Sequence, residues 1–311
     1  MGVFAERTHE VIETKECKIQ NKILQDIAND VYTFVLKNKD DLTVYDEKTR
    51  TGILRHLVLR IGVKNSEVVL TLVLNGKKFK KENEFIEYIT KKHPEVKTIV
   101  KNINQKNTNV ILGNENEVIY GDGFIHDEIL GYKFKISNMS FYQVNPIQTE
   151  VLYSKAIEYA NISENETIFD LYCGIGTIGI CASKNAKKLY GIETIKEAII
   201  DARENVKING IENAEYMVGD VENKLPEFIK ENSIKADVIF IDPPRKGCEK
   251  EVLDTILKIE PKRIVYVSCN VATLARDLKI LEEKYDIKKV TPVDMFPFTS
   301  HCEVISVLKL K

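Results

Sequence analysis

Three short segments carry residues suited to covalent chemistry on a ring carbon. "VYVSCNVATL" places Cys269 where a run of strand-like apolar residues ends and a helix-like segment begins. "IDPPRKG" places Asp242 after another such run, and its two prolines stiffen the loop. "FPFTSHCEV" places Glu303 at the start of a last apolar run. One thiol and two carboxylates are therefore expected at strand ends, where open α/β sheets carry their sites.

A thiol and a base together can methylate carbon 5 of a pyrimidine, which is a poor nucleophile. A thiolate that adds to carbon 6 makes an enolate, and carbon 5 can then attack a methyl sulfonium. A base must afterwards remove the carbon-5 proton, so Cys269 suits the nucleophile and Glu303 the base. Taken alone, a cysteine at a strand end is more often a packed small hydrophobe. The remaining cysteines of this half are expected to be packing residues: Cys173, Cys181, Cys248 and Cys302.

A glycine loop follows the first strand of the second half, in "FDLYCGIGTIG". Gly174 and Gly176 allow a tight turn and a close approach to a ligand. Asp170 stands before the loop and would repel an anion, which favours a cofactor with a positive amino group, such as S-adenosylmethionine. Glu193 ends the next strand and can accept hydrogen bonds from ribose hydroxyls, as it would for NAD as well. Asp220 ends the third strand and could accept one from an adenine amine.

The fourth residue of the Asp-Pro-Pro segment separates two kinds of methyl transfer. Amino-group methyltransferases often have an aromatic residue there, which stacks on the target base. Arg245 stands in its place, which disfavours that chemistry and suits contact with a phosphate or a carboxylate.

The pattern of elements predicts an α/β fold in two parts. Residues 136–311 alternate strands and helices, which predicts a parallel sheet covered on both faces. Two final strands are joined by a loop too short for a helix, so a Rossmann-like class I methyltransferase sheet with a C-terminal antiparallel hairpin is expected. Residues 1–135 contain short strands and glycine-marked turns, which predict a smaller, strand-rich α+β domain. Asn145 and Pro146 are expected to open a helix that ends near Asn161.

Composition bounds the class of protein. The 311 residues are 43% hydrophobic and 30% charged, the net charge is −2, and no apolar run approaches the ~20 residues that span a bilayer. A cytoplasmic protein without membrane association is expected. Nine lysines against four glutamates between Lys77 and Lys106 are expected to form mostly a solvated face. The six cysteines form no C-x-x-C pair, so no metal site is expected. No obligate protein partner is evident.

These motifs together resemble the S-adenosylmethionine-dependent RNA (uracil-5-)-methyltransferases of bacteria, which act on ribosomal or transfer RNA. The matching segments lie in the family's order within residues 137–311: "FYQVN", "DLYCGIGT", "GIE", "DPPRKG", "SCN" and "FPFTSHCE". The resemblance implies Cys269 as nucleophile and Glu303 as proton acceptor. It also implies that four residues line the cofactor and base pocket, with Asp220 a weaker cofactor contact: Gln143, Tyr172, Glu193 and Asp242. The strand-rich domain is then expected to face the RNA.

The sequence departs from this family at several points. Val271 replaces a proline that often follows Ser-Cys-Asn, which changes loop stiffness but removes no reactive group. Many members begin with a small barrel, and ribosomal-RNA members carry four cysteines that hold an iron–sulfur cluster. Cys17, in "KECKIQ", looks like the fourth of these. The resemblance therefore predicts a 23S ribosomal RNA enzyme in a form that lacks the barrel and three cluster cysteines.

Four other functions stay open at this point. Methylation of a transfer-RNA uridine uses the same chemistry, and an RNA cytosine-5 methyltransferase also uses a thiol, although the "DPPRKG" and "FPFTSHCE" pair argues against the latter. A non-catalytic RNA-binding fragment would keep its function in the Cys269→Ala variant. A small-molecule methyltransferase would have no need of the first 135 residues.

Overall fold

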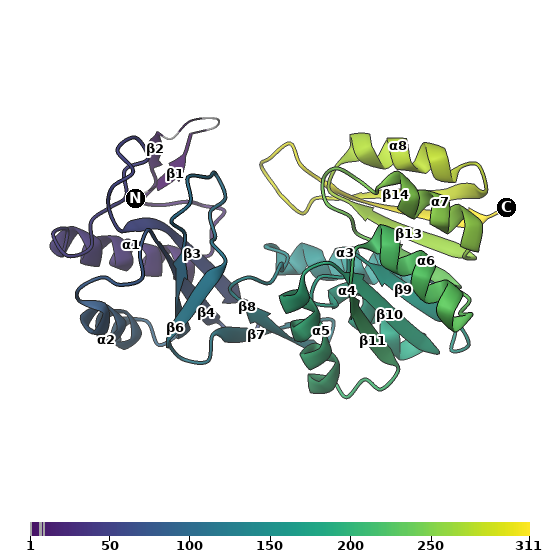
Figure 1. Ribbon diagram of the computed structural model, residues 1–311, viewed down its shortest axis with the longest axis horizontal. Helices are drawn as coiled ribbons and strands as arrows, with labels where there is room; N and C mark the ends of the chain where they lie inside the picture. Colours follow the sequence, from purple (N-terminus) through teal and green to yellow (C-terminus); the bar gives the residue numbers. More distant parts are fainter. Residues whose placement is uncertain (1, 6–7, 9) are drawn as a thin grey trace. The chain divides into compact units, whose positions relative to one another are not determined.

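A computed structural model describes residues 2–5, 8 and 10–311, which form two compact units (Figure 1). Unit 1 contains the chain up to Asp127 together with residues 136–138. Unit 2 contains residues 128–135 and 139–311. The chain thus passes between the units more than once around residues 127–139, and a single domain boundary at residue 135 stays a prediction.

Unit 1 is built on a four-stranded sheet in the order β3-β4-β5-β6. The outer pairs are antiparallel and the central pair β4-β5 is parallel. Strands β3 and β4 form a hairpin, with Gly62 opposite Glu67 beside the turn. A parallel pair needs a crossover connection, which α2 supplies. Its bounds and those of the strands are β3 (Leu54–Gly62), β4 (Glu67–Leu74), α2 (Glu82–Lys92), β5 (Val96–Ile103) and β6 (Glu115–Tyr120).

A helix that the sequence analysis did not predict, α1 (Lys22–Lys37), packs against β3 and α2. The Asn21 side chain caps it by accepting a hydrogen bond from the Ile23 amide at 2.9 Å. Its buried residues follow a helical period and join the core of unit 1: Ile27, Val31, Phe34 and Val35. Two short ribbons complete this half of the chain: β1 (Gly2–Phe4) with β2 (Val11–Glu13), and β7 (Phe124–Ile129) with β8 (Tyr132–Ser137).

Unit 2 has a seven-stranded sheet in the order β11-β10-β9-β12-β13-β15-β14. The first five strands are parallel, and β15 pairs antiparallel with both β13 and β14. This confirms the predicted parallel-rich sheet with a C-terminal hairpin. The strands are β9 (Thr167–Leu171), β10 (Lys188–Glu193), β11 (Ala214–Val218), β12 (Val238–Ile241), β13 (Arg263–Ser268), β14 (Tyr285–Val293) and β15 (Glu303–Leu310).

Helices cover both faces of this sheet (Figure 1). One group runs α3 (Pro146–Ala160), α4 (Thr177–Ala182), continued by a 3₁₀ turn (Ser183–Asn185), and α5 (Lys196–Ile208). The other runs α6 (Val221–Asn232), α7 (Lys250–Ile259) and α8 (Val271–Leu281). Asn145 caps α3 as expected, accepting from the Gln148 amide at 3.2 Å with Pro146 in the first turn. No helix among the described residues is long and apolar enough to cross a membrane.

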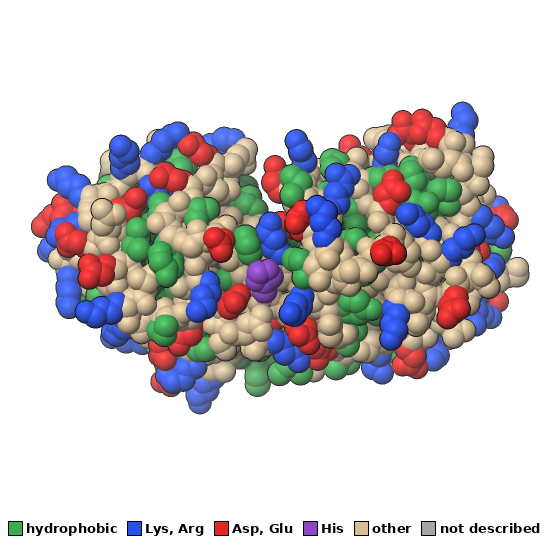
Figure 2. All heavy atoms as spheres, turned by 90° about the horizontal axis from the view of Figure 1, so that it is seen from below, with side chains coloured by type: hydrophobic (Ala, Val, Ile, Leu, Met, Phe, Trp, Pro, Cys, Tyr) green, Lys and Arg blue, Asp and Glu red, His purple; other side chains and the backbone are tan. Residues whose placement is uncertain are grey.

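On the face that Figure 2 displays, charges of both signs are mixed. Figure 2 shows lysine and arginine side chains interspersed with aspartate and glutamate on the face that it displays. Together with the net charge of −2, this arrangement gives that face no single-sign field of the kind that captures nucleic acid non-specifically.

Candidate active site

The strand order of unit 2 brings the predicted site residues to one edge of the sheet. β9 and β12 are neighbours although two helix–strand units separate them in the sequence, so the strand order reverses between them. Ligands of open α/β sheets bind at such a switch point, beyond the carboxyl ends of the strands. The glycine loop follows β9 and the Asp-Pro-Pro loop follows β12, so both loops flank this point.

The glycine loop turns sharply into α4. Gly174 and Gly176 have φ of +54° and +83°, the left-handed region that glycine enters at little cost. A Cβ on Gly176 would lie 2.6 Å from the Tyr216 hydroxyl, so packing also requires glycine there. Tyr172 adopts φ +61° without being a glycine, and such strain is most often found at functional sites.

A pocket opens above this loop, lined by Tyr172, Cys173, Gly174 and Asp242 among others. At its base lies Asp170, only 1% exposed, which accepts a hydrogen bond from the Gly179 amide at 2.9 Å. Burial and the nearby charge of Glu193 raise the pKa of Asp170 to about 7, although the Gly179 hydrogen bond opposes them. No lysine or arginine of the described chain forms an ion pair with it. The pocket thus holds a buried acidic group that lacks a cationic partner.

Glu193, the last residue of β10, reaches across to the loop. Its Oε2 accepts from the Gly174 amide at 3.2 Å, and its Oε1 accepts from the Thr194 hydroxyl and the Ile195 amide at 3.0 Å each. A carboxylate offers about four acceptor positions, so this one keeps capacity for a ligand hydroxyl. Glu193 therefore both fastens the loop and presents an acceptor beside the pocket.

The other half of the site is formed by β12, β13 and β15. These strands lie side by side, and Asp242 and Cys269 follow the ends of the first two. Ser268 pairs with Val304, so Cys269 and Glu303 flank a register pair at the same edge. Along the sequence Asp242 and Cys269 are distant, since 26 residues that include α7 lie between them. The sheet order brings all three together.

The charges of this cluster act on one another. Burial raises the pKa of Glu303 to about 7, against the opposing charge of Arg245. Burial also raises the pKa of Asp242, and the charges of Glu303 and Asp170 add to the shift. Burial and the two carboxylates Glu303 and Asp242 raise the pKa of the Cys269 thiol, which Arg245 partly offsets. Glu303 is thus poised to exchange a proton near neutral pH, and Cys269 rests as a thiol.

Hydrogen bonds hold the Asp-Pro-Pro loop against the start of α8. The Arg245 carbonyl accepts from the Asn270 Nδ2 at 3.0 Å and from the Thr273 hydroxyl at 3.2 Å. Asn270 also caps α8 by accepting from the Ala272 amide at 3.0 Å. Asn270 therefore gives the Ser-Cys-Asn segment a second use, because it ties the loop of Asp242 to the residue next to Cys269.

Two further predicted residues, Gln143 and Asp220, are not among those that line this pocket. Gln143 is buried, 8% exposed, in the segment before α3. Asp220 is exposed and stands at the N-terminus of α6, where its carbonyl accepts from the Asn223 and Lys224 amides. The roles of both residues stay predictions.

Five pocket residues were not assigned a role from the sequence, and three of them carry an aromatic ring or a hydroxyl group. Phe141 lines the pocket and is 69% exposed, within a quoted motif. Tyr153 on α3 and Thr177 on α4 also line it, and their hydroxyls are 3.0 Å apart. A tyrosine on a helix face carries no signal of its own, because only the packing of α3 on α4 brings it to the pocket.

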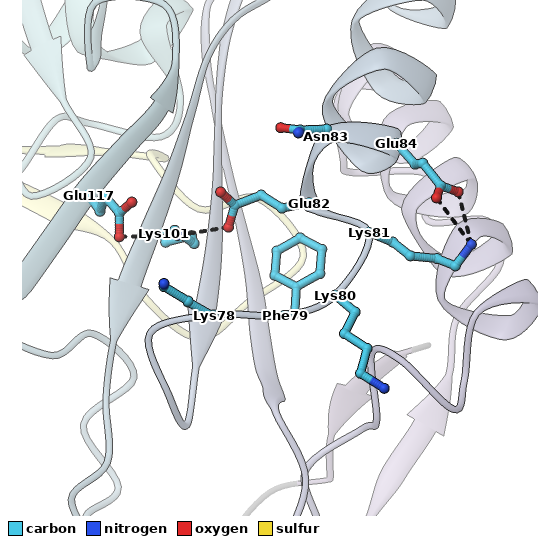
Figure 3. Close-up of a pocket in the computed structure, with 9 residues that line it drawn as sticks. All are labelled: Lys78, Phe79, Lys80, Lys81, Glu82, Asn83, Glu84, Lys101 and Glu117. Atoms are coloured by element: carbon cyan, nitrogen blue, oxygen red, sulfur yellow. Dashed lines mark hydrogen bonds and ion pairs between the residues drawn. The ribbon is translucent and has the colours of Figure 1, made fainter.

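A second pocket lies within unit 1, at the start of α2 (Figure 3). Figure 3 shows Lys101 between Glu82 and Glu117, and its Nζ lies 2.7 and 3.1 Å from their carboxylates. The same ammonium donates to the Lys77 carbonyl at 3.1 Å. Burial would lower the pKa of Lys101, but these two carboxylates raise it overall. This side chain, 2% exposed, is an exception to the solvated lysine face that was predicted.

The comparisons with known proteins decide the family. The model of the tRNA (uracil-5-)-methyltransferase family matches residues 65–311. The chain belongs to this family. An RNA methyltransferase of Oceanobacillus iheyensis is 44% identical over all of this chain and 68% of its own length. One from Halalkalibacterium halodurans is 46% identical over all of this chain and 67% of its own length. The resemblance inferred from the motifs is confirmed.

A solved structure agrees with this assignment. The Pyrococcus abyssi tRNA (uracil-54, C5)-methyltransferase, crystallised with S-adenosyl-L-homocysteine, matches with a TM-score of 0.81 and 28% identity. The match covers 98% of this chain and 72% of that one. The Methanocaldococcus jannaschii tRNA m1G37 methyltransferase, at 15% identity and a TM-score of 0.54, shares the fold alone, over 93% of this chain and 78% of its own. This member of the uracil-5-methyltransferase family is therefore an RNA methyltransferase with a class I fold.

Proposed function

We propose that this chain transfers a methyl group from S-adenosylmethionine to carbon 5 of a uridine in RNA, through a covalent bond between Cys269 and uracil carbon 6. The adjacency of β12, β13 and β15 carries the proposal, because it gathers Asp242, Cys269 and Glu303 at one sheet edge. A thiol beside carboxylates meets the two needs of this chemistry, a nucleophile and a proton acceptor.

The pocket above the glycine loop fits the cofactor, which supplies an electrophilic methyl group on a positively charged sulfur. Asp170 is a buried acid that lacks a cationic partner in the described chain, so it suits the cofactor's amino group. Glu193 keeps acceptor capacity for ribose hydroxyls. The proposed set is completed by the pocket-lining residues and by those predicted from the sequence: Tyr172, Gly174, Asp242, Gly176, Gln143 and Asp220.

The first covalent step uses Cys269. The thiol loses its proton to solvent, and Sγ then bonds to carbon 6 of uracil. The electron pair of the carbon 5–carbon 6 double bond moves toward the carbonyl oxygen at carbon 4, which makes carbon 5 nucleophilic enough to take the methyl group. Arg245 favours the anionic thiolate, since its charge opposes the rise in the pKa of Cys269 that burial and the two carboxylates cause.

The second step uses Glu303. Its carboxylate accepts the proton from carbon 5, the double bond re-forms, and the electron pair of the carbon 6–sulfur bond leaves with the Cys269 thiolate. A base is most effective when its pKa is close to the working pH, and burial brings the pKa of Glu303 to about 7. The buried environment that makes this carboxylate costly to ionise therefore also makes it a useful base.

The proposed substrate is a uridine of 23S ribosomal RNA, which the similarity of Cys17 and its neighbours to the cluster segment of ribosomal-RNA members supports. Transfer RNA is the second candidate, because the P. abyssi neighbour acts on uracil 54 of tRNA. In either RNA, the target base must leave its stack to reach Cys269.

The deciding experiment uses transcripts of 23S ribosomal RNA and of transfer RNA that contain 5-fluorouridine. With S-adenosylmethionine present, the carbon-5 fluorine cannot leave as a proton, so the adduct with Cys269 should persist on a denaturing gel. We expect a shifted band that Cys269→Ala abolishes and the control Cys302→Ala retains. A band that survives Cys269→Ala would overturn the assignment of the nucleophile. Cofactor binding without any adduct would favour a non-catalytic RNA-binding role.

A further inference from the structure

One side chain near the proposed site is both strained and almost fully exposed. Phe298 lies in the loop between β14 and β15 and is 93% exposed, the largest value for any large hydrophobic residue described. Its φ is +65°. The loop turns at Phe296–Thr299, where the Thr299 amide donates to the Phe296 carbonyl at 3.2 Å. A proline at the second position of a turn and a positive φ at the third position are features of a type II turn. Such a turn favours glycine or asparagine at the third position, which Phe298 occupies here.

Nothing in the described chain offsets this cost. The other bulky apolar residues with positive φ, Leu130 and Tyr172, are both partly buried. Phe298 instead holds an apolar ring in water on a backbone that glycine would adopt more readily. Strained conformations persist where surrounding structure imposes them, and they cluster at functional sites. The exposed ring is therefore expected to be buried only when something binds.

The base of the loop is held firmly. Met295 is 1% exposed, and its carbonyl accepts from the Asn145 Nδ2 at 3.1 Å. The Thr299 hydroxyl donates to the Phe296 carbonyl at 2.8 Å, and the His301 amide donates to that hydroxyl at 3.1 Å. These bonds fix the turn relative to the sheet. Phe298 is consequently presented on a supported tip rather than on a loose strand.

The position of the tip relates it to the proposed chemistry. Val293 pairs with Glu303 and closes the loop at its base, and Val304 pairs with Ser268 beside Cys269. The loop therefore rises from the same sheet edge as the proposed nucleophile and base. A ligand that reaches Cys269 and Glu303 would therefore pass close to this loop.

We infer that Phe298 is a positioning residue whose ring stacks on an RNA base next to the target uridine, and so keeps the target outside the base stack. This inference rests on the proposed function. A nucleotide that leaves a stack exposes the faces of its neighbours, and an apolar side chain that covers such a face offsets the lost stacking. Every base has such a face, so the contact tolerates different neighbouring sequences.

The test compares Phe298→Gly with Phe298→Tyr. Glycine removes the ring and suits φ +65°, so the melting temperature should stay or rise and S-adenosylmethionine affinity by calorimetry should not change. On folded 23S and transfer RNA transcripts, kcat/KM for tritiated methyl transfer should fall about tenfold. Tyrosine should restore it. On a short unstructured uridine oligonucleotide the loss should be smaller, since few neighbours are stacked.

Ser233→Gly is the matched control, because Ser233 is an exposed residue of unit 2 with φ +50°. It should relieve the backbone in the same way without affecting methylation. Unchanged kcat/KM for Phe298→Gly on the transcript that the wild type methylates would overturn the stacking role and leave the proposed function intact. A wild type that methylates none of these RNAs would overturn the proposed function and this inference together.

Discussion

The buried charged groups of the two units differ in whether they have partners of opposite charge. In unit 1, Lys101 is enclosed by Glu82 and Glu117, so each charge meets its opposite (Figure 3). In unit 2, Asp170, Asp242 and Glu303 are gathered without an ion pair to any described lysine or arginine, and the pKa of each is raised. The first arrangement satisfies its charges within the fold. The second leaves them for a ligand to satisfy, which is the difference between a structural cluster and a reactive one.

The largest expected effect comes from Glu303→Gln, which removes the proposed base and keeps the shape of the side chain. Addition and methyl transfer should survive while proton removal fails, so a methylated covalent adduct should accumulate. Turnover should fall by about 10²–10⁴-fold, as expected for loss of a general base. Tritium transfer and a denaturing gel measure both effects. Product release at the wild-type rate would mean that another group is the base.

Lys101→Met tests the paired side of the comparison. Methionine fills much of the volume but leaves Glu82 and Glu117 without their cation. The free energy of unfolding should fall by about 2 kcal/mol, a moderate cost because both carboxylates keep access to water. Urea denaturation of the full chain checks it, with the exposed Lys80→Met as control. Equal stability of the two variants would show that the pairing contributes nothing.

Glu193→Ala tests the connection between the glycine loop and the proposed cofactor site. It removes the acceptor of the Gly174 amide and the proposed contact with ribose. S-adenosylmethionine affinity should fall about tenfold, the loss expected when one hydrogen-bonded charged group is removed. Calorimetry measures it, with Glu197→Ala in the first turn of α5 as control. Unchanged affinity would remove Glu193 from the site.

The pH dependence follows from the sign of the shift at Glu303. Its pKa is raised to about 7, so the carboxylate is ionised above that pH and protonated below it. The rate of product release should therefore fall about fivefold when the pH is lowered from 7 to 6. Adduct formation with 5-fluorouridine RNA needs no proton removal from carbon 5, so its profile should lack this limb. Identical profiles for the two reactions would assign the limb to another group.

Asp170→Asn is expected to have the smallest effect. It should raise the free energy of unfolding, whereas Lys101→Met should lower it. The raised pKa of Asp170 means that folding favours its protonated form, so ionisation costs stability as pH rises from about 4 to 7. Asparagine keeps an acceptor for the Gly179 amide and carries no charge. At pH 8 the variant should have the higher free energy of unfolding, and at pH 4 the two proteins should be nearly equal, by urea denaturation. A gain that is independent of pH would mean that charge is not its cause.

Much of unit 2 was predictable because its signals are local. The capping Asn145 with Pro146, the glycine loop and the strand–helix alternation each depend on neighbouring residues, and the structure confirms the elements that they predict. In unit 1 the short strands were predicted, but α1 was not. Its signal was present in Asn21 and in the spacing of Ile27, Val31 and Phe34, although strand-like segments dominate the rest of that half.

The sequence by itself determined which chemical groups are available, because the identity of a thiol, a carboxylate or a glycine needs no fold. It also determined the family, since the motifs and their order are read directly from the chain. Only the tertiary structure decided that Asp242, Cys269 and Glu303 share one edge, because their proximity depends on the strand order β12-β13-β15. It alone decided that Asp170 and Glu303 have pKa values near 7 and that Lys101 is buried with its partners. Burial and the distance between charges are properties of packed chains, and residue spacing along the sequence does not contain them.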